Sequence, residues 1–167
     1  MIMFGSKKLK NEIDDLEATL DSLRTSLENL RDSHAQDLQL LRRQVAQVVS
    51  GQAPDPEAIL AGSPYTKIPA EKAADFISDT PELIILDVRT EGEWRHGHIP
   101  NAIHIDIHGF ASHVDKLPED KSRPIICFCA HGVRSAAACQ ILAQFGYGCL
   151  YNVDGGMSGY TGEVVVQ

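Results

Sequence analysis

Residues 124–135 read PIICFCAHGVRS, where an apolar run ends at a cysteine and an arginine follows five positions later. A backbone that leaves a strand, curls over a few residues and enters a helix points successive N–H groups inward, near the positive end of the helix dipole. Gly132 permits the dihedral angles that such a curl needs. These amides and the Arg134 charge would stabilise a thiolate at Cys129, so we expect its pKa to lie below about 8.5. The segment therefore predicts a nucleophilic sulfur that holds negative charge during its reaction.

The other cysteines, Cys127, Cys139 and Cys149, are interpreted as small buried core residues. An even number of cysteines could form disulfides, but we expect free thiols, because no export signal is visible and the domain is large enough to fold without them. The pattern Cys127-x-Cys129-x-His131 lacks the wider spacing and the second ligand pair of structural zinc sites. We therefore predict no metal site, and nothing in the sequence implies a cofactor.

The composition narrows the class of protein. The chain has 167 residues, of which 43% are hydrophobic and 23% charged, as expected for a soluble protein. The net charge of −8 argues against a nucleic-acid partner, because phosphate backbones select basic surfaces. No run of about 18 apolar residues is present, so no membrane span is predicted. The first residues, MIMFGSKKLK, do not resemble a signal peptide, and a cytoplasmic location is the default expectation.

Residues 1–49 are predicted to form a coiled-coil helix. No Gly or Pro occurs between residues 7 and 49, and apolar residues recur in alternating steps of four and three at Leu9, Ile13, Leu16, Leu20, Leu23, Leu27 and Leu30. Beyond Leu30 the spacing changes to an eleven-residue stutter. Residues 9–48 most simply pair with a second copy as a homodimer, of undetermined strand orientation. Two alternatives are an amphipathic helix lying on the domain, and an intrachain hairpin restarted by a capping box at Ser33 and Gln36.

Residues 50–64 hold three prolines and read as a linker, and residues 65–167 are predicted to form a separate domain. In that domain continuous apolar segments alternate with helical ones, which predicts an α/β fold with a parallel sheet covered by helices on both faces. The expected strands are 65–68, 83–88, 102–105, 125–128 and 149–153, and the expected helices are 69–78, 91–95, 110–117 and 135–145. Ligands bind such sheets at the carboxyl ends of the strands, where the 124–135 segment ends its own strand.

Three segments together resemble the rhodanese-like family. CAHGVRS is similar to the active-site loop of rhodanese domains, which has the pattern C-x-x-G-x-R-[ST]. LDVRTEGEWRHGHIPNAIHI, residues 86–105, resembles the second signature of the family, and NVDGGMSGY its closing G-G-[IM] motif. The resemblance covers about residues 65–160 in the family's order. It departs at Asn101, where glycine is usual, and at Tyr160, where the family commonly has tryptophan.

The resemblance implies a small parallel-sheet domain that transfers sulfane sulfur. Cys129 would attack thiosulfate or a similar donor, and a thiol or cyanide would accept the sulfur from its persulfide. The substrate-binding residues implied by position are Ala130, His131, Gly132, Val133, Arg134 and Ser135. One alternative is a non-catalytic regulatory module, and another is a phosphatase or arsenate reductase. Related phosphatases have five residues between cysteine and arginine, whereas four intervene here.

Two further sets of residues receive structural interpretations. The resemblance and their place at a strand end favour Asp87 and Arg89 as a structural pair rather than catalytic residues. His96 and His98 flank a glycine in a predicted turn, and we expect them to cap a helix or lie on the surface.

Overall fold

A computed structural model describes residues 3–49 and 55–166 of the chain. The chain divides into two compact units, of which the first ends at Leu38 and the second begins at Gln39.

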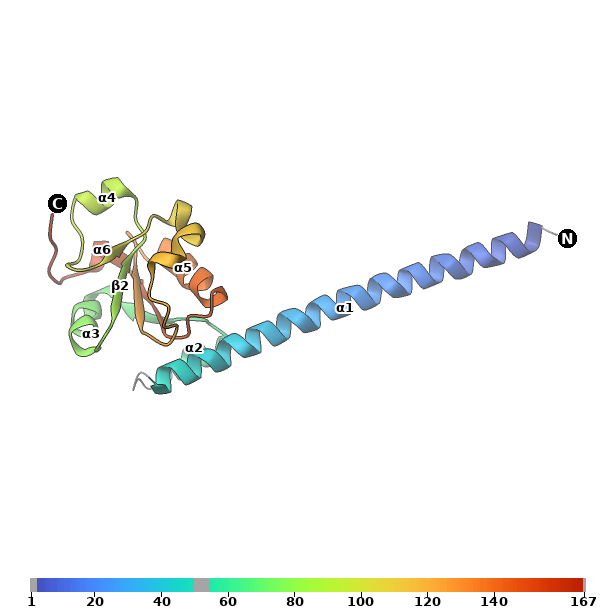
Figure 1. Cartoon of the computed structure of the whole chain (residues 1–167), viewed down its shortest axis with the longest axis horizontal. Coiled ribbons are helices and arrows are strands. Elements are labelled where there is room, and N and C mark those ends of the chain that lie inside the picture. Colours follow the sequence, from blue (N-terminus) through green and yellow to red (C-terminus); the bar gives the residue numbers. More distant parts are fainter. Residues whose placement is uncertain (1–2, 50–54, 167) are drawn as a thin grey trace. The chain divides into compact units, whose positions relative to one another are not determined.

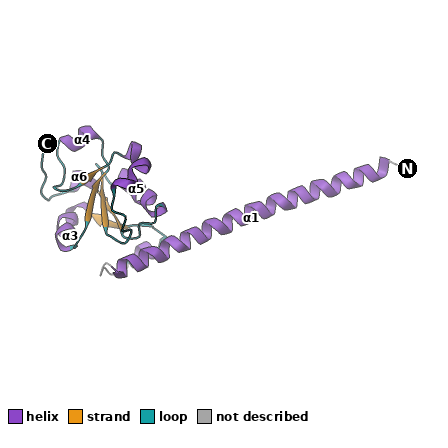
Figure 2. Cartoon of the chain, in the orientation of Figure 1, coloured by secondary structure: helices purple, strands orange, loops and turns teal. Residues whose placement is uncertain are grey.

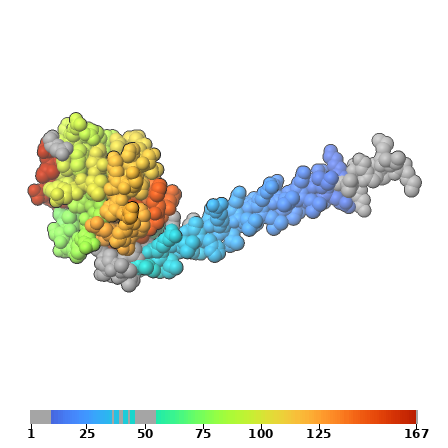
Figure 3. Space-filling model, viewed as in Figure 1, coloured from blue at the N-terminus to red at the C-terminus, as the bar shows by residue number. Residues whose placement is uncertain are grey.

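The N-terminal helix α1 spans Met3–Val49 without a break (Figure 1). It passes straight through Ser33, where the hairpin alternative requires a turn, so the intrachain hairpin is wrong. The apolar residues from Ile13 to Leu30 that make the heptad seam are between 48% and 65% exposed. Figure 3 shows the described part of α1 as a rod with side chains exposed along its length. Among the described residues, no helix is both long and apolar enough to cross a membrane.

The second unit contains a five-stranded sheet in the order β1-β5-β4-β2-β3 (Figure 2). Its strands are β1 (Thr66–Pro69), β2 (Ile84–Asp87), β3 (Ile103–His104), β4 (Ile125–Phe128) and β5 (Leu150–Asp154). Every pair of neighbouring strands is parallel. All four residues of the central strand β4 are buried, as expected for a strand covered on both faces. The predicted α/β fold with a parallel sheet is confirmed.

Helices cover both faces of the sheet, and Figure 1 shows α3 and α5 on opposite sides of β2. On one face Ile125 and Cys127 pack in a core with Leu142 of α5 (Val133–Gln144). On the other face Ile126 and Phe128 share a core with residues of α3 (Ala73–Asp79), the 3-10 helix η1 (Ala70–Lys72) and α6 (Gly156–Gly159). The alternation of side chains along β4 thus supplies two separate cores.

Two connecting segments differ from the sequence prediction. The helix expected at 110–117 is a 3-10 helix, η2 (Ile107–Lys116), with a kink at His113. The predicted linker contains a short helix, α2 (Pro56–Leu60), whose N-cap Asp55 accepts hydrogen bonds from two backbone N–H groups. Residues 50–54 of that linker lie outside the described residues.

The pairing of β2 with β4 brings two loops together at the carboxyl edge of the sheet. The hydrogen bonds continue one residue beyond β2, where the Val88 N–H donates to the carbonyl of Phe128, the last residue of β4, at 2.9 Å. After β2 the chain leads into α4 (Glu91–Arg95), and after β4 it leads into the Cys129 loop. Residues separated by about 40 positions in sequence therefore meet at one edge.

A glycine turn after β5 holds the Cys129 loop through backbone hydrogen bonds. Gly155 and Gly156 have φ values of 88° and 54°, which glycine adopts without strain. The turn directs the Met157 N–H to the Cys129 carbonyl at 2.8 Å and the Ser158 N–H to the Ala130 carbonyl at 3.1 Å. A Cβ atom at Gly156 would overlap the backbone of Cys129 and Ala130.

We expect Gly156→Ala to lower the free energy of unfolding by about 3 kcal/mol, because the methyl group forces the turn and the loop apart. Urea unfolding of the full chain measures the change. Gly92→Ala is the control, since a Cβ there meets nothing within 4 Å and alanine favours the helix. Equal stability of the two variants would contradict this account of the turn.

Candidate active site

Cys129 directly follows β4, and its side chain lies inside the loop that leads into α5. Its Sγ accepts hydrogen bonds from the Gly132 N–H at 3.0 Å and from the Ser135 hydroxyl at 3.4 Å. Gly132 has a φ of 103° at the N-cap of α5, and a Cβ there would lie 2.9 Å from the Val153 carbonyl oxygen. The curl predicted around Gly132 is therefore present and needs glycine on two grounds, dihedral angle and space.

The environment of Cys129 favours the thiolate. The residue is 1% exposed, and burial alone would raise the pKa of its thiol. Hydrogen bonds from the Ser135 hydroxyl, and from the backbone N–H groups of Ser135, His131 and Gly132, act in the opposite direction and outweigh burial. The pKa of Cys129 therefore lies below its ordinary value, as the sequence predicts. Neutral N–H and O–H donors are the largest causes that lower this pKa.

Arg134 is engaged by an acidic partner on the neighbouring loop. Its Nη1 and Nη2 bind the two carboxylate oxygens of Glu93 at 2.7 and 2.6 Å. The same carboxylate accepts from the Thr90 hydroxyl and the Thr90 N–H, which completes a capping box at the start of α4. Hydrogen bonds from Arg134, and secondarily from Thr90, hold the pKa of Glu93 well below its usual range, although burial alone would raise it. Glu93 in turn raises the pKa of Arg134.

Glu93 is the site residue that the sequence did not single out. Its signal is the spacing Thr90-x-x-Glu93, which is the pattern of a capping box at a helix start. The spacing predicts the cap but not the contact with Arg134. That contact depends on β2 and β4 being neighbours.

The other predicted loop residues differ in exposure. Ala130 is half-buried, whereas the side chains of His131 and Val133 are exposed, Val133 to 80%. Ser135 is fully buried beneath the sulfur. The loop thus presents an imidazole and an apolar side chain to solvent, with the hydroxyl on the inner side.

Asp87 and Arg89 form a buried pair, in agreement with their structural interpretation. Arg89 Nη2 lies 2.6 Å from Asp87 Oδ2 and donates to the Gly97 carbonyl at 2.7 Å. The pair ties the end of β2 to the turn at Gly97.

His98 does not lie on the surface, because its ring is buried and stacks on Trp94 at 3.7 Å between centroids. The capping alternative is confirmed, because its Nδ1 lies 3.2 Å from the Trp94 carbonyl oxygen in the last turn of α4. The backbone of His98 forms an antiparallel bridge with that of Val165. The periodicity of the sequence does not predict this bridge.

Cys127, Cys139 and Cys149 are fully buried, as predicted. Neither these three cysteines nor Cys129 forms a disulfide bond. Burial, and secondarily Cys127, raise the pKa of Cys139, which suits an unreactive core thiol. Within the described residues, no group of three or more potential metal ligands occurs.

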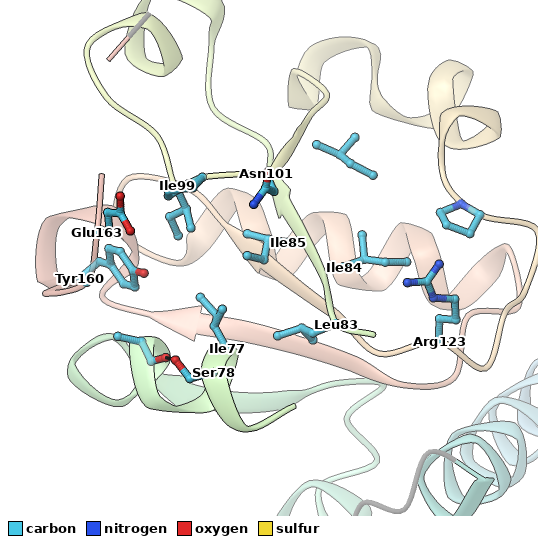
Figure 4. Close-up of a pocket in the computed structure, with 15 residues that line it drawn as sticks. Ile77, Ser78, Leu83, Ile84, Ile85, Ile99, Asn101, Arg123, Tyr160 and Glu163 are labelled. Carbon is cyan, nitrogen blue, oxygen red and sulfur yellow. Dashed lines mark hydrogen bonds between the residues drawn. The ribbon is translucent and has the colours of Figure 1, made fainter. Parts of the chain in front are cut away.

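One cavity in the second unit lies away from Cys129. It has a volume of about 580 Å³ and is lined by apolar side chains such as Ile77, Leu83 and Ile85, with Arg123 and Glu163 among its polar residues (Figure 4). Cys129 and the loop that follows it do not line this cavity. Hydrogen-bond donors converge on Cys129, which makes its sulfur the candidate reactive group.

Residues 69–163 match the family model described as "Rhodanese-like domain". This is more than half of the chain, and it includes the Cys129 loop. The chain belongs to the rhodanese-like family. The match covers strands β2 to β5 and both signature loops, but it leaves out α1 and all of β1 except Pro69. Membership therefore concerns the second unit alone.

Rhodanese-like relatives carry different names. The chain is 33% identical over 92 residues to the thiosulfate sulfurtransferase GlpE of Pseudomonas savastanoi, covering 55% of this chain and 83% of that protein. It is 26% identical over 156 residues to the tRNA uridine(34) hydroxylase of Erwinia tasmaniensis, covering 88% of this chain but only 44% of that protein. A rhodanese-like domain protein from Staphylococcus aureus has a similar structure, with a TM-score of 0.55, 28% identity, and 61% and 98% of the two chains covered.

We expect Ser135→Ala to raise the pKa of Cys129, because the thiolate loses a hydrogen-bond donor. At pH 7 the thiolate fraction falls, and alkylation of Cys129 by iodoacetamide should slow roughly threefold. The pH profile of alkylation, followed by mass spectrometry of the Cys129 peptide, measures the shift. The control is Ser158→Ala, since Ser158 is exposed and bonds the loop through its backbone N–H. An unchanged profile for Ser135→Ala would show that the hydroxyl does not stabilise the thiolate.

Proposed function

We propose that the protein is a sulfurtransferase that carries sulfane sulfur as a persulfide on Cys129. The observation that carries this proposal is the convergence of the Gly132 N–H and the Ser135 hydroxyl on the Cys129 sulfur. The lowered pKa of Cys129 increases the fraction of nucleophilic thiolate at a given pH. The rhodanese-like family and its members named sulfurtransferase support the same chemistry.

The reaction divides into two nucleophilic displacements. In the first, the Cys129 thiolate attacks the outer sulfur of a donor, forming an S–S bond as the bond to the leaving group breaks. With thiosulfate, this step gives the Cys129 persulfide and sulfite. In the second, a thiol or cyanide attacks the outer sulfur of the persulfide and restores the thiolate. The donors around Sγ hold negative charge throughout, and the implied substrate-binding residues from Ala130 to Ser135 surround the transferred sulfur.

Three alternative functions fit the site less well. Four residues separate Cys129 from Arg134, and a ring of this size suits a sulfur atom better than a tetrahedral phosphate. The relatives named tRNA hydroxylases are more than twice as long as the segment that matches, and a net charge of −8 does not favour RNA. A purely regulatory module would not need a lowered cysteine pKa. The cytoplasmic location remains a prediction.

We expect Cys129→Ser to abolish sulfur transfer from a donor to cyanide, because a hydroxyl cannot form the persulfide. Incubation of the wild-type chain with a donor should add about 32 Da to the Cys129 peptide, the mass of one sulfur atom. Cys127→Ala is the control, since it removes a buried thiol on the same strand.

Transfer that survives in Cys129→Ser would exclude Cys129 as the carrier. A second comparison assays one preparation with p-nitrophenyl phosphate and with a sulfur donor. Phosphate hydrolysis faster than sulfur transfer would favour the phosphatase class.

We further propose that residues 9–48 pair with a second copy of the chain. Six apolar side chains of the seam, from Ile13 to Leu30, are about half to two-thirds exposed. A stripe only two positions wide in each heptad is typical of a coiled-coil seam. A single helix cannot bury its own seam, and two copies would cover it by packing against each other.

Leu20→Asp with Leu27→Asp should dissociate the full chain, because both substitutions place charge inside the seam. Light scattering at tens of micromolar protein measures the mass, which should halve if the wild-type chain is a dimer. The control, Ala18→Asp with Thr25→Asp, adds the same charge two positions away on the outer face of the helix. A wild-type chain that is monomeric at this concentration would contradict the pairing.

A further inference from the structure

Arg134, the cation of the Cys129 loop, lies in an ion pair at the boundary between protein and water. Both of its terminal nitrogens bind Glu93, at 2.7 and 2.6 Å, and the two side chains are 31% and 35% exposed. The two charges cancel. A substrate that approaches the loop therefore meets a pair of zero net charge instead of a free guanidinium.

Glu93 competes with the reactive sulfur for this cation. Glu93 is the first cause of the raised pKa of Arg134, and the charge and hydrogen bonding of Cys129 act in the same direction more weakly. The guanidinium thus lies within electrostatic reach of both groups, with the carboxylate as its principal partner. The sulfur depends mainly on neutral donors, the Gly132 N–H and the Ser135 hydroxyl.

This arrangement affects possible donors unequally. In the reaction of the Cys129 thiolate with thiosulfate, a group with one negative charge meets a dianion, and the leaving group, sulfite, departs with two negative charges. A hydropersulfide, R–S–SH, is uncharged at its sulfurs. Attack on its outer sulfur gives the Cys129 hydropersulfide and releases RS⁻, which carries the single negative charge that the thiolate brought. A site without a net positive charge disfavours the first reaction far more than the second.

We propose that Glu93 is a specificity-determining residue, which neutralises Arg134 and so directs the Cys129 site towards hydropersulfides of thiols in preference to dianionic thiosulfate. The proposal rests on the sulfurtransferase function proposed above. Glu93 does not touch the transferred sulfur in this scheme and acts through Arg134 alone.

The test compares Glu93→Gln with wild type in the full chain. Glutamine retains the shape of the side chain and can still serve the capping box with Thr90, but it frees the Arg134 charge. We expect kcat/KM for thiosulfate to rise about tenfold, chiefly through a lower KM, and the gain to shrink at high salt. With the hydropersulfide of 2-mercaptoethanol as donor, kcat/KM should stay within about twofold of wild type.

Glu91→Gln is the matched control. It removes the same charge from the same helix, but Glu91 bonds Arg95 at 2.8 Å and lies 3.5 Å from His104, on exposed surface. We expect it to leave the preference between the two donors unchanged. Urea unfolding of both variants checks that the capping box survives.

A second readout does not require sulfur transfer. Iodoacetate and iodoacetamide alkylate the same thiolate but differ by one negative charge, and the ratio of their rates at Cys129 reports the local field. Glu93→Gln should raise the iodoacetate to iodoacetamide ratio about tenfold, and Glu91→Gln should not.

The possible outcomes separate the two proposals. An unchanged alkylation ratio in Glu93→Gln, or an equal loss of rate with both sulfur donors, overturns the role of Glu93 and leaves the function of Cys129 standing. A wild-type chain that prefers thiosulfate also overturns it. If Cys129 gains sulfur from neither donor, the sulfurtransferase function falls, and the donor preference falls with it.

Discussion

The hydrogen bonds to the Cys129 sulfur are the interaction on which the rest of the site depends. A buried anion is costly unless donors replace the water that it loses. Here the donors are a backbone N–H and a hydroxyl, both carried on the first turn of α5 and its cap. They reach the sulfur only because Gly132 adopts a positive φ beside the carbonyl of Val153. The residue types at Gly132 and Ser135 are thus constrained by the geometry of the hydrogen bonds to the Cys129 thiolate.

The loop keeps its shape because neighbouring strands hold it from two sides. Beneath it, the glycine turn after β5 donates two backbone hydrogen bonds to the carbonyls of Cys129 and Ala130. Beside it, α4 supplies Glu93 to Arg134. The buried pair of Asp87 and Arg89 fixes the segment that leads into α4. Rigid supports of this kind let the site hold charge without rearranging during a reaction.

The apolar side chains of α1 differ from those of the sheet and its helices in how they are buried. In the second unit, side chains alternate across a parallel sheet, and each face finds a helical partner within the chain. The apolar seam of α1 stays exposed between Ile13 and Leu30. The family match begins at residue 69 and so leaves this helix out. Its pairing with a second copy would place two Cys129 sites in one assembly while leaving the chemistry of each site to its own loop.

The sequence alone determined the features that depend on local pattern. The continuous apolar runs predicted the parallel sheet, since strands buried on both faces carry no polar alternation. The segment CAHGVRS predicted the curl and the lowered pKa of Cys129, because both arise from neighbours within six residues. The unbroken heptad steps predicted a long helix through Leu30. Helix ends were less accurate: the helix expected at 110–117 is the 3-10 helix η2 (Ile107–Lys116), which begins three residues earlier.

Only the tertiary structure decided what lies opposite each functional side chain. Arg134 pairs with Glu93 across 41 positions of sequence, because β2 and β4 are neighbours in the sheet. The backbone of His98 likewise exchanges hydrogen bonds with that of Val165, which is far from it in the sequence. Patterns of residue type report which groups a chain carries and which face they share. The partner of a charge is set by strand order, and strand order is a property of the folded sheet that local spacing does not encode.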